Sequence, residues 1–239
     1  MKPIKSLLKR IATLIPLSWA ERYMTLKVGY PAFSYAPDGE DLILRNMFRG
    51  KNNGFYVDVG AHHPTRFSNT RLLYRIGWHG INIDAMPSSM GAFRKERTRD
   101  VNLECAISSQ PETLTFHVFK EPAYNTFSVK TAAECEKNGH QIIRRIEIKT
   151  ETLANVFKNN IPEGQSVDLL TIDIEGYDLE ALRSNDWSRC KPEVIAVECI
   201  GFDTENPVKS EIYNYLKGLG YLLEIATPKN IFFRKKKHA

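Results

Sequence analysis

Four acidic residues are conspicuous because each closes a short apolar run. Asp58 ends "FYVD", Asp84 ends "INID", Asp173 follows "DLLTI" and Glu198 ends "VIAVE". A buried strand without a further role would more simply end in a Gly or Asn turn. If these runs are parallel strands of one sheet, their carboxyl ends share one rim, which is where ligands bind in open α/β sheets. The sequence therefore predicts a ligand site with a floor of carboxylates.

The runs that must position these acids alternate with helical patterns. The expected strands span residues 54–61, 78–87, 101–108, 144–150, 166–176, 191–199, 221–227 and 230–236. The expected helices span residues 38–48, 68–77, 88–97, 151–160, 178–184 and 209–218, the first capped by Asp38 and the fourth beginning at Glu151. This alternation predicts an α/β, doubly wound, mainly parallel sheet. The last two strands lie too close together for an intervening helix and predict an antiparallel edge hairpin. Segment 112–120 alternates apolar and polar residues, which predicts an antiparallel excursion rather than a core strand.

Composition and charge limit the class of protein. The 239 residues are 42% hydrophobic and 26% charged, which is ordinary for a globular protein and is enough for one large domain. The four cysteines form no CxxC pair, which favours reduced thiols and a cytoplasmic protein. The net charge of +5 comes from the two ends. Without the four cations of residues 1–20 and the four of residues 234–237, the body carries −3, which argues against a nucleic-acid partner.

Residues 1–30 form a basic, amphipathic segment that precedes a domain spanning residues 31–239. Its apolar residues recur at helical spacing and its lysines fall on the opposite side. The apolar stretches are too short and too interrupted by charge to span a bilayer. Two alternatives stay open: a helix packed on the domain, or a helix lying on an anionic membrane surface. The second would place the protein peripherally on the inner membrane surface.

The residues at the predicted rim limit the ligand. A dinucleotide would require GxGxxG, but only Gly60 follows the first strand, and no P-loop occurs. Asp58 is placed to meet an ammonium group or an ordered water. Asp84, at the end of the next strand, is placed to accept hydrogen bonds from ribose hydroxyls. A nucleoside with a cationic, amino-acid-like tail and no phosphate satisfies both acids, and S-adenosylmethionine is such a molecule.

The chain resembles a known family in three sequence motifs. The motifs "YVDVGAHHP…SNT", "GWHGINIDAMP" and "DLLTIDIEGYDLEAL…KPEVIAVE" are similar to those of the FkbM-type S-adenosylmethionine-dependent methyltransferases, over about residues 34–198. The branch it most resembles O-methylates sugar hydroxyls in bacterial glycans and lipo-oligosaccharides, and includes nodulation-type fucose 2-O-methyltransferases. The resemblance implies a class I methyltransferase Rossmann-like fold, S-adenosylmethionine as donor and a sugar or lipid-linked glycan as acceptor.

The resemblance also assigns candidate donor-binding residues. These are Asp58, Gly60 and Ala61 in the donor loop, Asp84 for the ribose, Ala106 for the adenine pocket, and Glu40 and Asp41 in the entry segment "DGEDLIL". The glutamine that the family usually carries in that segment is Pro37 here. Asn69 and Thr70 open a predicted helix, where such residues are most often caps. Asn69 is also a candidate for a polar contact with the donor.

Candidate catalytic residues follow from the chemistry of methyl transfer to a hydroxyl, which requires alignment of the acceptor oxygen and removal of its proton. Asp173 and Glu175, at i and i+2, would point the same way on a strand. Asp173 is the preferred base, with Glu175 or His62 orienting the acceptor. The turn histidines could instead bond only to backbone. Clustered carboxylates could also hold Mg²⁺. Two other classes stay open: an NAD-dependent sugar oxidoreductase, and a non-catalytic glycan or membrane adaptor.

Overall fold

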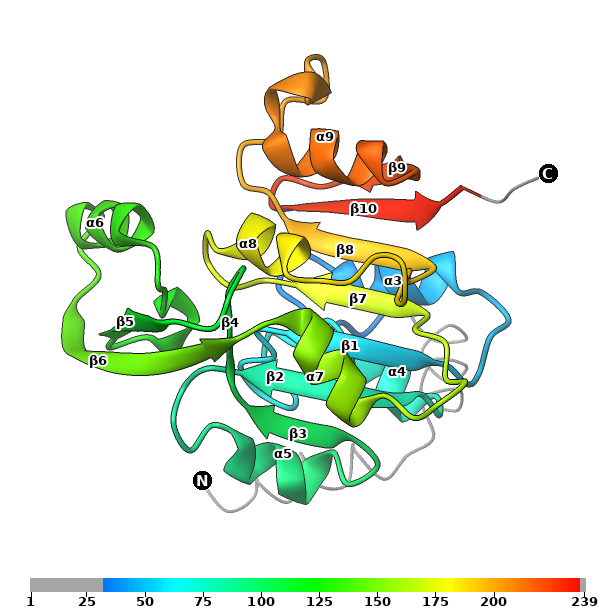
Figure 1. Ribbon diagram of the computed structural model, residues 1–239, viewed down its shortest axis with the longest axis horizontal. Coiled ribbons are helices and arrows are strands. Elements are labelled where there is room, and N and C mark those ends of the chain that lie inside the picture. The colour runs from blue at the N-terminus through cyan, green and yellow to red at the C-terminus, as the bar shows by residue number, and fades with distance from the viewer. Residues whose placement is uncertain (1–31, 237–239) are drawn as a thin grey trace.

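The computed structural model describes residues 32–236, which form a sheet covered by helices on both faces (Figure 1). The basic N-terminal segment and its two alternative placements lie outside the described residues. Among residues 32–236, every helix is too short or too polar to cross a bilayer.

The central sheet has seven strands in the order β3-β2-β1-β7-β8-β10-β9. Its strands are β1 (Phe55–Val59), β2 (His79–Asp84), β3 (Val101–Glu104), β7 (Leu169–Ile172), β8 (Val194–Glu198), β9 (Tyr221–Ala226) and β10 (Asn230–Lys235). The first five strands in this order are parallel, whereas β10 runs antiparallel to both β8 and β9. The predicted doubly wound sheet with an antiparallel edge hairpin is therefore confirmed.

Alternating side chains of each strand face two separate cores. Val57 and Val59 of β1 pack in one core with α7 (Leu153–Asn160), α8 (Asp178–Arg183) and α9 (Glu211–Gly218). Tyr56 packs in the other with α3 (Glu40–Met47) and α4 (Arg71–Arg75). Strands that are buried on both faces have no side facing solvent, so both of their faces are apolar. This explains the near-continuous apolar runs in the sequence. Helix α5 (Met90–Glu96) packs Met90 and Phe93 against Ala61.

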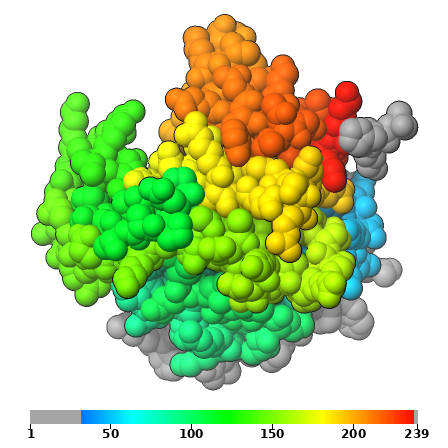
Figure 2. Space-filling model, viewed as in Figure 1, coloured from blue at the N-terminus to red at the C-terminus, as the bar shows by residue number. Residues whose placement is uncertain are grey.

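Residues 106–151 form an extension, here called the arm, inserted between β3 and α7. Its elements are β4 (Ala106–Ile107), β5 (Thr113–Phe119), the 3₁₀ turn η1 (Pro122–Tyr124), α6 (Val129–Lys137) and β6 (Ile142–Glu151). Strands β5 and β6 pair antiparallel, which confirms the predicted excursion. The parallel strands of the central sheet point toward the arm, which stands out as a green lobe in Figure 2. The arm therefore lies beyond the carboxyl ends of the strands.

Several predicted boundaries and caps were wrong. Asp38 does not cap α3: the helix begins after Gly39, which has left-handed backbone and provides no side-chain cap. Helix α7 begins at Leu153 rather than Glu151, because the Thr152 hydroxyl accepts the Asn155 N–H. The strand predicted over residues 101–108 breaks at Cys105, where the chain leaves the central sheet and enters the arm.

The cap predicted for α4 was also misplaced. Neither Asn69 nor Thr70 caps this helix; instead the Ser68 hydroxyl accepts the Arg71 N–H at 3.1 Å. The hydroxyl of Thr70 donates to Asp58, and the amide of Asn69 donates to Thr171. Both side chains therefore bond into the sheet, which leaves capping to the residue before them.

A buried guanidinium fastens the loop after β1 to the sheet. The Arg97 side chain is fully buried, and its Nε donates to Asp100 at 2.9 Å. Its terminal nitrogens donate to the Pro64 carbonyl at 3.1 Å, the Tyr56 hydroxyl at 3.0 Å and the Thr70 hydroxyl at 2.6 Å. A buried charge is tolerated only when it is paired and hydrogen-bonded in this way. Arg97 thus holds strand β1 and the loop that follows it in one arrangement.

Arg97→Met should lower the free energy of unfolding by about 3–5 kcal/mol, because the buried Asp100 carboxylate loses its partner. Urea denaturation followed by circular dichroism measures the loss. The matched control, Arg183→Met, breaks an ion pair with Glu211 whose side chains are 49% and 78% exposed. It should cost less than about 1 kcal/mol. Equal losses for the two variants would contradict the role given to Arg97.

Candidate active site

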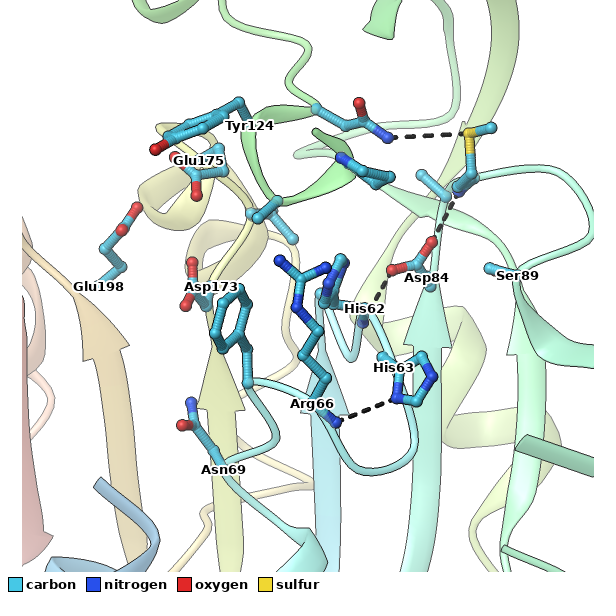
Figure 3. Close-up of a pocket in the computed structure, with 18 of the residues that line it drawn as sticks. His62, His63, Arg66, Asn69, Asp84, Ser89, Tyr124, Asp173, Glu175 and Glu198 are labelled. Carbon is cyan, nitrogen blue, oxygen red and sulfur yellow. Dashed lines mark hydrogen bonds between the residues drawn. The ribbon is translucent and has the colours of Figure 1, made fainter. Parts of the chain in front are cut away.

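A cavity of about 710 Å³ lies at the carboxyl ends of the parallel strands (Figure 3). Its volume is in the range of small-molecule sites, roughly 300–1,000 Å³. The loop after β1, the ends of β2 and β8, the turn after β7, the turn between β9 and β10, and the arm all contribute to its walls. The rim predicted from the strand-end acids is therefore a real cavity in the fold.

Gly60 lets the loop after β1 pass closely between its neighbours. Its backbone is left-handed, with φ of +85°, and a Cβ atom there would overlap the backbone oxygen of Asp173. The N–H groups of Gly60 and Ala61 both donate to the Ile83 carbonyl, at 2.9 and 3.0 Å. The loop is thereby tied to β2 on one side and lies against the turn after β7 on the other. Only glycine fits this position without strain.

Asp84 ends β2 and lines the cavity. One carboxylate oxygen accepts the His62 N–H at 2.9 Å and the other accepts the Met86 N–H at 2.8 Å. Burial raises the pKa of Asp84, and these two hydrogen bonds oppose the rise. A carboxylate has about four acceptor sites, so the oxygens can still accept hydrogen bonds from a ligand. Asp84 thus lies where a hydroxyl-bearing group can be held.

The two turn histidines have different roles. The His63 Nδ1 accepts the backbone N–H groups of Thr65 and Arg66, at 3.1 and 3.0 Å, so this ring stabilises the turn. His62 has a left-handed φ of +55° and stacks on Phe67, with ring centroids 6.0 Å apart. Burial lowers the pKa of His62, which favours the neutral form of its ring. Both rings line the cavity.

Three carboxylates converge on the opposite wall. Asp173, Glu175 and Glu198 each place one oxygen within 4.8 Å of the others (Figure 3). The predicted convergence of Asp173 and Glu175 is confirmed, but the reason given for it was wrong. Strand β7 ends at Ile172, so both acids lie in the turn, where Glu175 has a left-handed φ of +54°. Turn geometry, rather than strand alternation, brings the two side chains together.

The environment of this cluster disfavours its charged form. Burial, followed by the neighbouring carboxylates, raises the pKa values of Asp173 and Glu198. Burial and Asp178 raise the pKa of Glu175 to about 7. Lys229 opposes the rise for Glu175 and Glu198, and its ammonium pairs with Asp38 at 3.1 Å. The cluster can therefore hold protons near neutral pH, as a general base or acid must.

Glu40 and Asn69, both predicted as donor-binding residues, line the cavity. The Glu40 carboxylate accepts the Asn230 amide at 2.9 Å and the Asp38 N–H at 3.0 Å. The Asn69 amide donates to Thr171 at 3.2 Å. Both side chains are therefore held in place at the cavity wall. Their assignment as ligand contacts stays a prediction.

Two predicted acids lie behind the wall instead. Asp58 is buried, accepts the Thr70 hydroxyl at 2.7 Å and faces Arg97. Burial raises its pKa to about 6. Asp41 accepts the Ser34 hydroxyl at 2.6 Å and the Tyr35 N–H at 2.7 Å. The cavity wall contains neither side chain, so a contact of Asp58 with an ammonium group or an ordered water stays a prediction. The two acids support the loops that form the wall.

Two predicted alanines are also packed behind the wall. Ala61 contacts the core formed with Met90 and Phe93, and Ala106 belongs to a cluster with Phe116 and Phe127. The cavity wall contains neither methyl group. Phe116 and Phe127 do line the cavity, so the apolar surface expected at Ala106 is present on the aromatic rings beside it.

Sequence reasoning missed several lining residues. They are Arg66, Met86, Ser89, Glu121, Tyr124 and Lys229. Tyr124 and Glu121 belong to the arm, whose position depends on tertiary contacts. Lys229 lies in the turn between β9 and β10. The neighbouring "SNT" motif could have drawn attention to Arg66, which pairs with Glu121 at 3.0 Å and lies between Asp84 and the carboxylate cluster in Figure 3.

Comparison with known proteins gives a family match. A family model described as the methyltransferase FkbM domain matches residues 58–223. No curated protein sequence matches the chain at a significant level.

Solved structures with a similar arrangement include three methyltransferases. A precorrin-6y C5,15-methyltransferase from Geobacter metallireducens is 13% identical, with a TM-score of 0.46 over 82% of this chain and 87% of that one. A putative rRNA methylase from Clostridium thermocellum is 11% identical, with a TM-score of 0.46 over 87% and 100%. An O-methyltransferase from Bacillus cereus in complex with SAH is 10% identical, with a TM-score of 0.37 over 90% and 97%.

The raised pKa of Glu175 predicts how the stability of the ligand-free protein depends on pH. Its pKa is about 7 in the folded protein, against about 4.3 in an unfolded chain. Between these values the folded state keeps a proton that the unfolded state has lost, so stability falls as the pH rises. Glu175→Gln should remove this loss and make the protein more stable than wild type at about pH 8, by about 1–3 kcal/mol.

Urea denaturation at about pH 5 and about pH 8 measures both proteins. Glu163→Gln, on an exposed loop, is the matched control and should follow the wild-type profile. A Glu175→Gln protein that loses as much stability as wild type over this pH interval would show that Glu175 is already ionised at low pH.

Proposed function

Because the chain belongs to the FkbM family and is an S-adenosylmethionine-dependent methyltransferase, we propose that it methylates a sugar hydroxyl of a bacterial glycan or lipo-oligosaccharide. The sheet order, with antiparallel β10 inserted next to the edge, is the Rossmann-like order of class I methyltransferases. Family membership sets aside the NAD-dependent oxidoreductase and the non-catalytic adaptor considered from the sequence.

The wall around Asp84 fits S-adenosylmethionine. The Asp84 carboxylate is held by two backbone N–H groups and has acceptor sites left for ribose hydroxyls. Met86, Phe116 and Phe127 give the same part of the wall an apolar surface suited to adenine. When bound, the donor supplies an electrophilic methyl group on a sulfonium. The residues of the chain must hold the donor, orient the acceptor hydroxyl and remove its proton.

Asp173 is the proposed general base. It lies at the carboxyl end of a central strand, lines the cavity and adjoins Gly60 of the donor loop. Its raised pKa makes its carboxylate a stronger base than an exposed aspartate. Glu175 and Glu198 lie close enough to accept hydrogen bonds from other hydroxyls of the acceptor and so to orient it.

One observation carries the proposal of a sugar acceptor: the carboxylate cluster shares its wall with the aromatic ring of Tyr124 (Figure 3). A sugar presents several hydroxyl donors around a ring with an apolar face. Carboxylate oxygens suit the hydroxyls, and an aromatic ring suits the apolar face. An acceptor with a single hydroxyl on an apolar body would not use three neighbouring carboxylates.

Asp84→Ala should weaken binding of S-adenosylmethionine by about 10–100-fold, because charge-assisted hydrogen bonds to the ribose are lost. Isothermal titration calorimetry measures the affinity. The matched control is Glu104→Ala, which removes an exposed acid at the end of the adjacent strand β3, directly opposite Asp84 in the sheet register. Unchanged affinity in the Asp84 variant, or an equal loss in both, would rule out this donor site.

Asp173→Asn should reduce turnover of a methyl glycoside acceptor by about 10²–10⁴-fold, because it removes the proton acceptor but keeps the side-chain size. Mass spectrometry of the glycoside, for a gain of one CH₂ group, reports the reaction. The affinity for S-adenosylmethionine should stay within a few-fold of wild type. If wild-type protein methylates none of a panel of glycosides, the sugar proposal fails.

The same assay tests whether the carboxylates hold Mg²⁺ instead. In that case EDTA would mimic the Asp173 variant, and added Mg²⁺ would restore the wild-type rate. If Asp173 acts as the base without a metal, EDTA leaves wild-type turnover unchanged. Near-normal turnover of the Asp173→Asn protein would place the base elsewhere, with His62 the next residue to test.

A further inference from the structure

The arm contributes three aromatic rings to the cavity wall, those of Phe116, Tyr124 and Phe127, and Tyr124 is the one beside the carboxylate cluster. Tyr124 is half-buried and lines the cavity on the side away from Asp84, next to Glu175 (Figure 3). His140, which is not part of the cavity wall, covers the ring at a centroid distance of 3.9 Å and an interplanar angle of 32°. His140 thus supports the ring of Tyr124, which also lines the cavity.

The ring is held by the short turn that carries it. Glu121 accepts the Ala123 N–H at 3.4 Å at the start of η1, and Asn125 accepts the Phe119 N–H at 2.8 Å just after it. These bonds fasten both ends of the turn to the arm. Tyr124 is therefore pre-organised, and a ligand that stacks on it pays little entropy for ordering the side chain.

The arm is also joined to the turn that carries the catalytic acids. The Thr126 hydroxyl donates to the Glu175 carbonyl at 2.7 Å. A Cβ atom at Gly176 would lie 2.6 Å from the Thr131 hydroxyl and 3.4 Å from Ser128, so the two segments fit closely. Tyr124 and Glu175 are thus held relative to each other, as two contacts of one subsite must be.

The charges around this subsite exclude one class of acceptor. Six carboxylates line the cavity, namely Glu40, Asp84, Glu121, Asp173, Glu175 and Glu198. Of the cations in the described wall, Arg66 pairs with Glu121 and Lys229 pairs with Asp38. An anionic substituent on the acceptor would meet carboxylates whose charged forms already repel one another. Hydroxyl or ammonium substituents would instead donate to them.

We infer that the acceptor is a sugar without an anionic substituent, which stacks on Tyr124 and donates hydroxyl or ammonium hydrogen bonds to Glu175 and Glu198. This inference rests on the proposed sugar methylation but adds the subsite and the charge class. It also makes the η1 turn of the arm the element that selects the acceptor, whereas Asp84, Met86 and the arm residues Phe116 and Phe127 hold the donor.

The test measures binding rather than methyl transfer. Ligand-observed NMR titrations of the full chain, saturated with S-adenosylhomocysteine, compare methyl glucoside, methyl glucosaminide and methyl glucuronide. The neutral and amino glycosides should bind at least about ten-fold more tightly than the glucuronide. Tyr124→Leu should weaken the first two by about ten-fold or more, and Tyr124→Phe, which keeps the ring, by no more than about three-fold.

The controls separate this inference from the proposed function. Val129→Ala changes an exposed arm residue outside the cavity wall and should leave all three affinities unchanged. Unchanged affinity for S-adenosylhomocysteine shows that each variant is folded. Glucuronide binding as tight as that of the glucoside, wild-type affinity in Tyr124→Leu, or binding of none of the three would overturn the inference. If the glycosides bind through Tyr124 but none is methylated, the proposed function fails and the subsite stands.

Discussion

The buried ion pair between Arg97 and Asp100 is the interaction on which the cavity depends. Its guanidinium reaches strand β1 through Tyr56, the start of α4 through Thr70 and the donor loop through the Pro64 carbonyl. Removing so many polar groups from water is costly unless all of them are satisfied, so few other arrangements of these segments are open to the chain. The loop from Gly60 to Asn69 can therefore present its backbone and side chains to the cavity in one fixed geometry.

The carboxylate cluster has the opposite character. Around Arg97 a buried cation is paired with acids, whereas Asp173, Glu175 and Glu198 face the cavity together and repel one another. Burial and repulsion raise their pKa values, and Glu175 adopts a strained left-handed backbone. Strain and unbalanced charge persist when the surrounding fold over-determines them, and they concentrate at sites that bind or react. Here the close contact of Gly60 with the Asp173 carbonyl and the bond from Thr126 to Glu175 supply that constraint.

The sequence was sufficient to predict the sheet, its edge hairpin and the rim at which the acids meet, because hydrophobic periodicity and strand order determine all three. Alternation along "FYVDV" could also have indicated that Asp58 lies on the Tyr56 side of the sheet, facing α3 and α4, away from Val57 and Val59. Its role behind the wall depends on Arg97, thirty-nine residues away, and no local pattern identifies that partner. The position of Tyr124 was likewise unpredictable, since the arm is placed by tertiary contacts with the turn after β7.

The loop after β1 and the arm are joined to the fold in different ways. This difference determines which part of the cavity wall can change independently of the rest. The loop after β1 is fastened through the buried network of Arg97, whereas it meets the arm in the ion pair of Arg66 and Glu121, whose side chains are 47% and 42% exposed. An exposed pair of this kind contributes little stability. The arm is instead held to the turn that carries Glu175, through the Thr126 hydroxyl and the close fit at Gly176. Changes confined to the η1 turn, which carries Tyr124, would therefore alter the proposed acceptor subsite and leave in place the proposed donor surface, to which Phe116 and Phe127 of the same arm contribute.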